Sequence, residues 1–287
     1  MAPDVRHSLR IGELSRRVGI SPELLRAWER RYGLLHPART DGGLRLYSAE
    51  DERRVRAMQA HLDGGLSAAE AARLVSDGDG AAGTAEHGDA IERGVGELRD
   101  ALDAMDADAA HAVLDGLLAS FTLEAVLAGV VLPYLRELGE RWRRGEASVA
   151  EEHFASNLVR ARLLALTRGW ERGEGPTALL ACAPGERHDL PLIAFGLALR
   201  GRGWRIVFLG ADTPAASIAE AAERLRPAVV VVSSVTPRGF RREADALTAL
   251  AREHRVVIAG AGASEKLAES LGSALLQGDP VTAAGAV

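Results

Sequence analysis

Apolar side chains recur every three to four residues along the first part of the chain and mark two short amphipathic helices. One apolar face runs over residues 11–18 and another over residues 24–28, with Gly19 available for the turn between them. Ser21 is a preferred N-terminal capping residue, and the proline that follows it suits the first position of a helix. The pattern predicts a helix-turn-helix in which Trp28 belongs to the buried side of the second helix.

A short β-hairpin and two further helices follow. The stretch HPARTDGGLRLYS carries Asp-Gly-Gly, which favours a tight hairpin turn. Two helices are predicted over residues 48–75, the first of them opened by Ser48. A helix-turn-helix of this kind places its second helix in the major groove of DNA, and the hairpin would form a wing that faces phosphates. The predicted DNA-facing residues are Ser21, Arg26, Arg30 and Arg31 of the helix-turn-helix and Arg39, Arg45 and Tyr47 of the wing.

The distribution of charge agrees with a polyanionic partner for this region. The chain has 35 basic and 40 acidic residues and a net charge of -5, but residues 1–75 hold 13 arginines against 10 acidic residues. A basic end on an acidic chain is typical of proteins that bind nucleic acid. The pattern and the charge together predict double-stranded DNA as a partner.

Composition narrows the class of protein. A length of 287 residues allows two or three domains, and a hydrophobic content of 47% is typical of globular chains. No apolar run is long enough to span a bilayer, and the N-terminus lacks a signal-peptide pattern. The single Cys182 excludes a disulfide framework and a multi-cysteine zinc site. We therefore expect a cytoplasmic protein with no membrane partner.

Residues 77–88, with the sequence DGDGAAGTAEHG, show no periodic apolar pattern and predict a flexible linker at a domain boundary. Helical periodicity then resumes, and Pro133 should perturb the third of the helices that follow. The four predicted helices cover residues 89–105, 107–120, 122–144 and 148–170. Taken alone, this region indicates a helical bundle for dimerisation.

The junction between the third and fourth of these helices gathers unusual side chains. Ser148 and Glu151 form a capping box, which places Glu152 and His153 in the first turn of the fourth helix. Trp142 lies close to the end of the third helix, at the same junction. Each residue also has a separate structural explanation. Trp142 could fill the core, and Glu152 could interact favourably with the helix dipole.

The last third of the chain alternates β-rich apolar runs with helical segments. Five runs, beginning with TALLACA, predict five strands of a doubly wound parallel α/β sheet. Ligands of such sheets bind at the carboxyl ends of the strands. The turn after the first strand carries Glu186 and His188, so a loop would hold the imidazole above the sheet edge, where Glu186 could fix its tautomer. A capping or surface role for His188 is the alternative.

Two other loops of this sheet, SSVTP and AGAGAS, follow the third and fourth strands. Their small residues would let a bulky planar ligand approach closely. The candidate residues in these loops are Ser233, Ser234, Thr236, Gly260 and Gly262.

The first region resembles the MerR family of winged-helix regulators. The resemblance covers residues 8–76 and rests on the motifs R-x-W-E-R-R-Y-G-L-L, beginning at Arg26, and Y-S-x-x-D, beginning at Tyr47. It implies a winged helix-turn-helix that binds operator DNA.

The remaining regions, residues 89–172 and 176–287, resemble the cobalamin-binding unit of methionine synthase and of CarH/LitR-type regulators. That unit joins a helical bundle to a flavodoxin-like domain whose Asp-x-His-x-x-Gly motif supplies the lower cobalt ligand. His188 matches this histidine, while Glu186 replaces the Asp and Pro191 replaces the Gly.

The bundle side of the resemblance concerns the upper face of adenosylcobalamin. In CarH-type regulators that face is shaped by a Trp separated by nine residues from a Glu-His pair, and Trp142, Glu152 and His153 have this spacing. Light-sensing relatives place a histidine directly after the Trp, where this chain has Arg143.

Taken together, the resemblance implies a multidomain α and α/β protein with a winged helix-turn-helix, a helical bundle and a flavodoxin-like parallel sheet. It implies a regulator rather than an enzyme: a light-responsive, cobalamin-dependent repressor that uses adenosylcobalamin. The cobalt would be ligated by His188, and the DNA-binding form would be a ligand-dependent homo-oligomer, a dimer or a tetramer. Two alternatives are a MerR-like regulator that senses another small molecule and a corrinoid-binding enzyme or carrier.

Overall fold

A computed structural model describes residues 7–40, 42–77 and 83–287. Contacts between residues divide the chain into two compact units, of which the first comprises residues 1–101 with 106–130 and the second residues 102–105 with 131–287. Within the described residues, no helix combines the length and the apolar character needed to cross a membrane.

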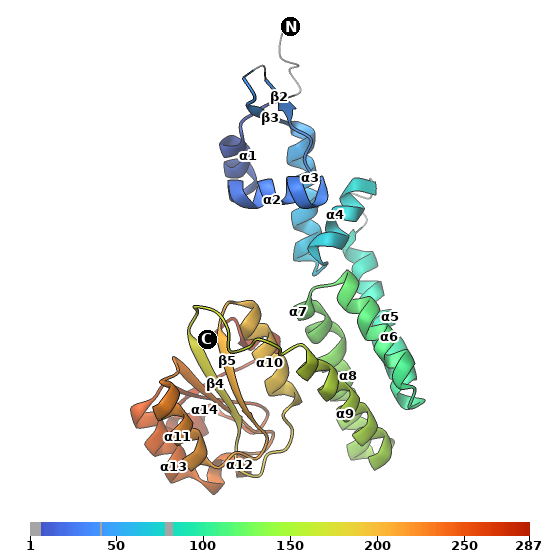
Figure 1. Ribbon diagram of the computed structural model, residues 1–287. Coiled ribbons are helices and arrows are strands. Elements are labelled where there is room, and N and C mark those ends of the chain that lie inside the picture. The colour runs from blue at the N-terminus through green and yellow to red at the C-terminus, as the bar shows by residue number, and fades with distance from the viewer. Residues whose placement is uncertain (1–6, 41, 78–82) are drawn as a thin grey trace. The chain divides into compact units, whose positions relative to one another are not determined.

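The first unit begins with the winged helix-turn-helix that the sequence predicts (Figure 1). Its strands form a three-stranded antiparallel sheet of order β1-β3-β2, in which β1 is a strand that the pattern did not predict. The elements are β1 (His7–Leu9), α1 (Ile11–Val18), α2 (Pro22–Tyr32), β2 (Ala38–Arg39), β3 (Arg45–Ser48), α3 (Ala49–Asp63) and α4 (Ala68–Asp77).

Local signals in the sequence set the turn of the helix-turn-helix. Gly19 ends α1 in the left-handed conformation with φ 69°, which glycine adopts without strain. The Ser21 hydroxyl then accepts a hydrogen bond of 3.3 Å from the amide of Leu24 and caps α2. Trp28 is buried, as predicted, so α2 keeps its remaining face for solvent.

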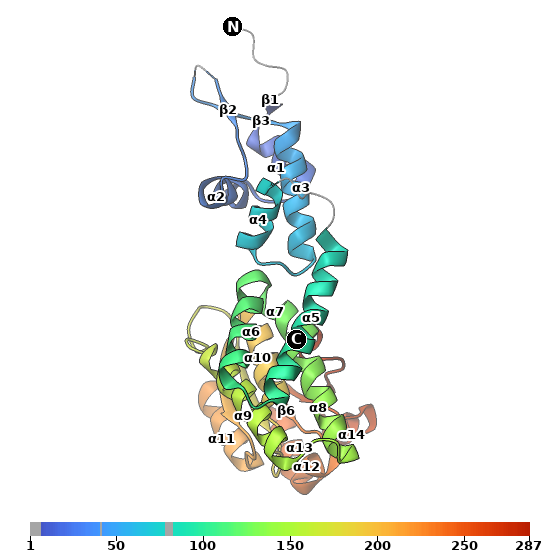
Figure 2. The same ribbon diagram turned by 90° about the vertical axis from the view of Figure 1, so that its right-hand side faces the viewer.

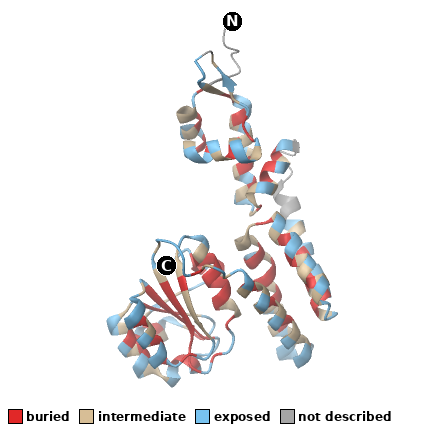
Figure 3. Ribbon diagram, in the orientation of Figure 1, coloured by how far each residue is buried: buried red, intermediate tan, exposed pale blue. Residues whose placement is uncertain are grey.

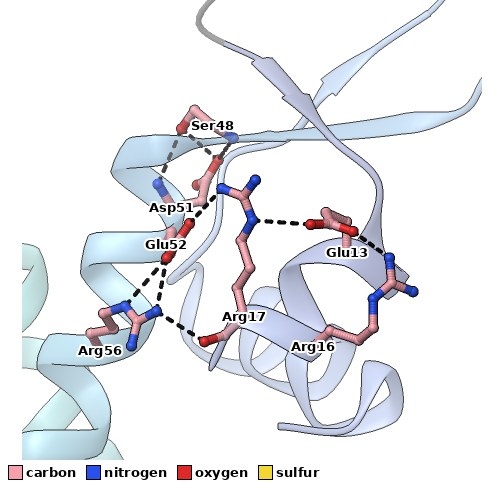
Figure 4. A network of polar contacts seen from close by, with 7 residues as sticks. All are labelled: Glu13, Arg16, Arg17, Ser48, Asp51, Glu52 and Arg56. Atoms are coloured by element: carbon pink, nitrogen blue, oxygen red, sulfur yellow. Dashed lines mark hydrogen bonds and ion pairs between the residues drawn. The ribbon is translucent and has the colours of Figure 1, made fainter. Parts of the chain in front are cut away.

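A network of ion pairs holds α1 against α3 (Figure 4). Arg17 donates hydrogen bonds to Glu13 at 3.1 Å and to Glu52 at 3.3 Å, and Arg56 donates to the backbone oxygen of Arg17 at 2.9 Å. Hydrogen bonding from Arg56 is the main reason why the pKa of Glu52 lies below its ordinary value. Arg17 therefore serves to hold α1 against α3.

The predicted bundle region is helical, with differences at three places. Residues 83–88, predicted as linker, form the start of a helix, and residues 78–82 lie outside the described residues. The third predicted helix is interrupted by a π-helical turn directly before Pro133, which lacks the N–H that a regular ladder needs. The fourth ends earlier than predicted. The elements are α5 (Gly83–Asp103), α6 (Ala107–Ser120), α7 (Leu123–Val126), η1 (Leu127–Val131), α8 (Leu132–Arg144) and α9 (Val149–Ala165).

The second unit contains the predicted five-stranded parallel sheet. Its strand order is β5-β4-β6-β7-β8, the order 2-1-3-4-5 of flavodoxin-like folds, so the predicted fold class is confirmed. The strands are β4 (Thr177–Cys182), β5 (Arg205–Gly210), β6 (Val229–Ser233), β7 (Val256–Ala259) and β8 (Ala274–Leu275). The helices between and after them are α10 (Leu190–Gly201), α11 (Ala215–Leu225), α12 (Pro237–Arg242), α13 (Ala244–Glu253), α14 (Glu265–Leu271) and α15 (Pro280–Ala283).

Helices cover both faces of this sheet. One face packs against α11, α13 and α14 in a core that includes Ile218, Leu247 and Leu271. The other carries α10, which contacts α15 and α9. Both faces are covered, so every residue of β6 is buried. Figure 3 shows buried residues along the strands of this sheet. The helices α8 and α9 of this unit lie side by side (Figures 1 and 2).

A methyl group on Gly262 is expected to destabilise this unit. Its Cβ would lie 2.3 Å from the backbone carbon of Thr236, so the loops after β6 and β7 would have to separate. We expect Gly262→Ala to cost about 1–3 kcal/mol of unfolding free energy, as overpacking does. Urea unfolding followed by circular dichroism measures the loss. Gly139→Ala in α8 is the control, because an added Cβ meets nothing within 4 Å among the described residues; equal midpoints for both variants would contradict the prediction.

Candidate functional site

A cavity of about 840 Å³ opens at the carboxyl ends of the parallel strands in the second unit. One wall comes from α8 and α9, and the other from the loops after β4, β5 and β6. Among the side chains that line it are Trp142, Glu152, His153, Ser156, Arg160, His188 and Asp212. The cavity therefore brings together the bundle residues and the strand-end histidine that the sequence singled out separately.

His188 lies in this cavity with 69% of its side chain exposed. Its Nδ1 is 2.6 Å from Oε1 of Glu186, which also accepts a hydrogen bond of 2.8 Å from the His188 amide. A carboxylate only accepts hydrogen bonds, so Nδ1 is the ring nitrogen that donates to Glu186. Nε2 is thereby left as the ring nitrogen that can ligate a metal.

Glu186 is buried and points into the protein. Its Oε2 accepts hydrogen bonds from the Ser234 hydroxyl at 3.0 Å and the Val235 amide at 2.7 Å. Burial raises the pKa of Glu186, but the hydrogen bonds from His188, Val235 and Ser234 together lower it below its ordinary value. The Glu in place of Asp therefore reaches the loop after β6 and remains a carboxylate.

Pro191, the other departure from the motif, lies in the first turn of α10. A proline there costs no helical hydrogen bond, because the first amides of a helix have no partner within the helix. The departure therefore leaves the loop between β4 and α10 intact.

Cys182 lies beneath this loop, fully buried at the end of β4. Burial, and then the charges of Asp189 and Glu186, raise the pKa of its thiol to about 12. We expect iodoacetamide at pH 8 to label the native protein on the order of 1000-fold more slowly than an ordinary thiol, because so little thiolate is present. Mass spectrometry over time measures the rate, and protein unfolded in urea is the control. Rapid labelling of the native protein would contradict this environment.

The bundle wall presents the other predicted residues. Trp142 is 51% exposed and lines the cavity, so it does not fill a core. The capping box of Ser148 and Glu151 forms as predicted. The side chain of His153 is 69% exposed, and its Nε2 lies 3.6 Å from Oε2 of Glu152.

A second cavity, of about 730 Å³, lies between α8, α10, α15 and the ends of β6, β7 and β8. It shares Leu135, Pro191 and Val235 with the first cavity and is lined also by Ser233 and Gly260.

The structure changes the interpretation of the other loop residues. Within the described residues, Ser234, Thr236 and Gly262 line neither of these cavities. Ser234 instead holds Glu186. A Cβ at Gly260 or Gly262 would lie 2.5 Å from the Ser234 oxygen or 2.3 Å from the Thr236 carbon, so both glycines let two loops touch. Gly260 also lines the second cavity.

The first unit has a second candidate surface. A recess of about 650 Å³ between α1, α2 and the wing is lined by four arginines: Arg10, Arg16, Arg26 and Arg45. The sequence pattern did not single out Arg10 and Arg16 as DNA-facing residues, because only the fold brings them next to the wing. Ser21, Arg30, Arg31 and Arg39 are all exposed, as the prediction requires.

The structure corrects the prediction that Tyr47 faces DNA. Its side chain is fully buried, and its hydroxyl donates a hydrogen bond of 2.9 Å to Glu29. Burial, followed by this hydrogen bond, raises the Tyr47 pKa above its ordinary value. Arg45 is half-buried and contacts the same carboxylate at 2.9 Å, so Glu29 anchors the wing to α2.

Three family models match this chain. The family model described as MerR HTH family regulatory protein matches residues 9–77, and two models of B12 binding domains match residues 95–167 and 176–281. A solved structure, that of the Methanosarcina barkeri monomethylamine corrinoid protein, matches 68% of this chain and 97% of its own with a TM-score of 0.58 and 18% identity, which supports the fold of the matched part.

Two curated relatives match most of the chain. The HTH-type transcriptional repressor CarA of Myxococcus xanthus is 39% identical over 91% of this chain and 89% of its own. The HTH-type transcriptional repressor CarH of the same organism is 34% identical over 94% of this chain and 95% of its own. The chain therefore belongs to the family of MerR-type helix-turn-helix regulators with B12-binding domains that includes these repressors.

Proposed function

We propose that this protein is a cobalamin-dependent transcriptional repressor that responds to light. Residues 8–76 bind operator DNA, and residues 89–172 and 176–287 hold the cofactor. The observation that carries the proposal is one cavity in which an exposed imidazole, fixed by a buried carboxylate, lies together with an exposed indole. The protein acts in the cytoplasm by binding rather than by catalysis.

The residues present fit a large planar corrinoid. His188 would ligate cobalt from below through Nε2, while Trp142, Glu152 and His153 would shape the upper side. The adjoining cavity beside Ser233 and Gly260 would accept the nucleotide tail. The two cavities, of about 840 and 730 Å³, share lining residues, and each is within the range typical of ligand sites.

The adenosyl form is the cofactor that we propose, with Trp142 covering its upper substituent. Adenosylcobalamin supplies a weak cobalt–carbon bond that visible light cleaves. Arg143 folds back onto its own helix, donating to the Gly139 oxygen at 3.3 Å, and a guanidinium does not ligate metals. A change in how α8 and α9 pack at this cavity would then alter the oligomer that binds DNA.

The test combines size and spectrum. Protein loaded with adenosylcobalamin in the dark should elute from a size-exclusion column as a larger assembly, a dimer or a tetramer, than the apo-protein, and should retard operator DNA. Illumination should break this assembly down and release the DNA. Protein loaded with hydroxocobalamin, which lacks the adenosyl group, controls for cofactor binding alone.

The proposed light response would be overturned if neither adenosylcobalamin nor light changed the elution volume or the binding of operator DNA. If adenosylcobalamin failed to bind at all, a different small-molecule ligand would become the better proposal.

A further inference from the structure

We infer that the ion pair between Arg160 and Asp189 is a positioning device that ties the cobalt-ligand loop to α9. The inference rests on the proposed function, because it concerns how His188 is held toward a corrinoid. It assigns a role to two residues that the sequence gave no reason to single out.

The pair has an unusual geometry. Asp189 is only 3% exposed and accepts three hydrogen bonds from Arg160, at 3.0 and 3.0 Å from Nε and at 2.7 Å from the terminal nitrogen. Asp189 occupies the N-cap position of α10, where an aspartate ordinarily caps its own helix. Here no side-chain capping bond forms within the described part of the chain, and the carboxylate is committed to Arg160 instead.

The loop that carries His188 is thereby held from both sides. Glu186, two residues before His188, is fixed by the loop after β6, and Asp189, directly after His188, is fixed by α9. The first attachment belongs to the sheet and the second to the helical wall of the cavity. The position of the imidazole therefore depends on where α9 lies.

Arg160 also belongs to a row along α9. Glu152, Ser156 and Arg160 are four residues apart, so they stack on one face of the helix, and all three line the cavity. The Ser156 hydroxyl donates to Glu152 at 2.7 Å. One helix face thus carries Glu152, which we propose for the upper side of the cofactor, and Arg160, which holds the loop of its lower ligand.

A displacement of α9 would consequently move the His188 loop, because the Arg160–Asp189 ion pair connects the two. Arg160 forms a fork that matches a carboxylate in two places, so the contact resists both stretching and rotation. We expect the pair to keep histidine ligation complete and to slow release of the cofactor.

The experiment uses the full-length protein loaded with cobalamin and two variants, Arg160→Gln and Asp189→Asn. Protein labelled with ¹⁵N-histidine and reduced to cobalamin(II) reports the axial nitrogen by EPR, because ¹⁵N and ¹⁴N split the cobalt lines differently. We expect each variant to lose about half of the histidine-ligated signal and to release cobalamin roughly tenfold faster, a factor that equals about 1.4 kcal/mol.

Asp103→Asn is the matched control. It breaks another Arg–Asp pair of the same unit, in which Arg141 donates to both oxygens of Asp103 at 3.0 and 2.9 Å. This variant should lower the unfolding temperature to a similar degree but leave the EPR signal and the release rate unchanged. Arg160→Gln removes a side chain that is 43% exposed, so it should fold even if Asp189→Asn does not.

The outcomes separate the two proposals. Unchanged ligation and release in Arg160→Gln would overturn the inference, as would equal changes in Asp103→Asn. A wild-type protein without a ¹⁵N-histidine signal would overturn the proposed cobalt ligand itself.

Discussion

Replacing His188 with alanine is expected to abolish histidine-ligated cobalamin. The Nε2 of this largely exposed imidazole is the atom that we propose as the metal ligand, and Glu186 holds the ring through Nδ1. Outer partners of ligating histidines alone are worth about 10–100-fold in affinity, so loss of the ligand itself should weaken binding on the order of 100-fold or more. Visible spectra and equilibrium dialysis with hydroxocobalamin measure both effects.

His254→Ala supplies the control for this prediction. His254 ends α13 in the same unit and lines neither cavity among the described residues. Its variant should bind cobalamin as the wild type does. If His188→Ala kept the wild-type spectrum, His188 would be a surface residue and the cobalt assignment would fail.

Removing Arg26 and Arg30 together should nearly abolish specific binding to operator DNA. Both lie exposed on α2, and neither makes an ion pair within the described part of the chain, so their charges are available to DNA. Each hydrogen bond from a charged group contributes roughly 1.5–3 kcal/mol, so the double alanine variant should bind at least about 100-fold more weakly. The slope of log affinity against log salt should fall by about 0.9 for each phosphate that the variant no longer neutralises.

The control for DNA binding is Arg224→Ala on α11, an exposed arginine of the second unit. Fluorescence anisotropy with labelled operator at several salt concentrations compares the variants. Cobalamin binding should be normal in all of them, because His188 and its cavity belong to the second unit. An unchanged salt slope in the double variant would remove these arginines from the interface.

The architecture could be predicted well from local pattern. The turn at Gly19, the cap at Ser21 and the capping box at Ser148 each rely on neighbours three or four residues away, and all three form as predicted. The five parallel strands were equally clear, because strands buried on both faces are continuous apolar runs. The sequence predicted only that Pro133 would perturb its helix. The π-helical geometry of the interruption depends on the surrounding packing, which local pattern does not record.

The sequence singled out residues for which we propose cofactor binding, but not the residues that support them. His188, Glu186 and Trp142 were predicted because their spacing and, for the first two, their strand-end position mark them. Ser234 and Gly262 were expected to meet a ligand, whereas the structure uses them to support Glu186 and to let two loops touch.

The sequence by itself determined most of the helices and strands and the motif residues for which we propose cobalt binding, because these depend on local periodicity and short motifs. Tertiary structure decided which of the polar side chains are available. It buried Tyr47 against Glu29, placed Arg10 and Arg16 beside the wing, and paired Arg160 with Asp189. Residues 29 positions apart meet only when helix and sheet pack, and no local pattern records such a contact.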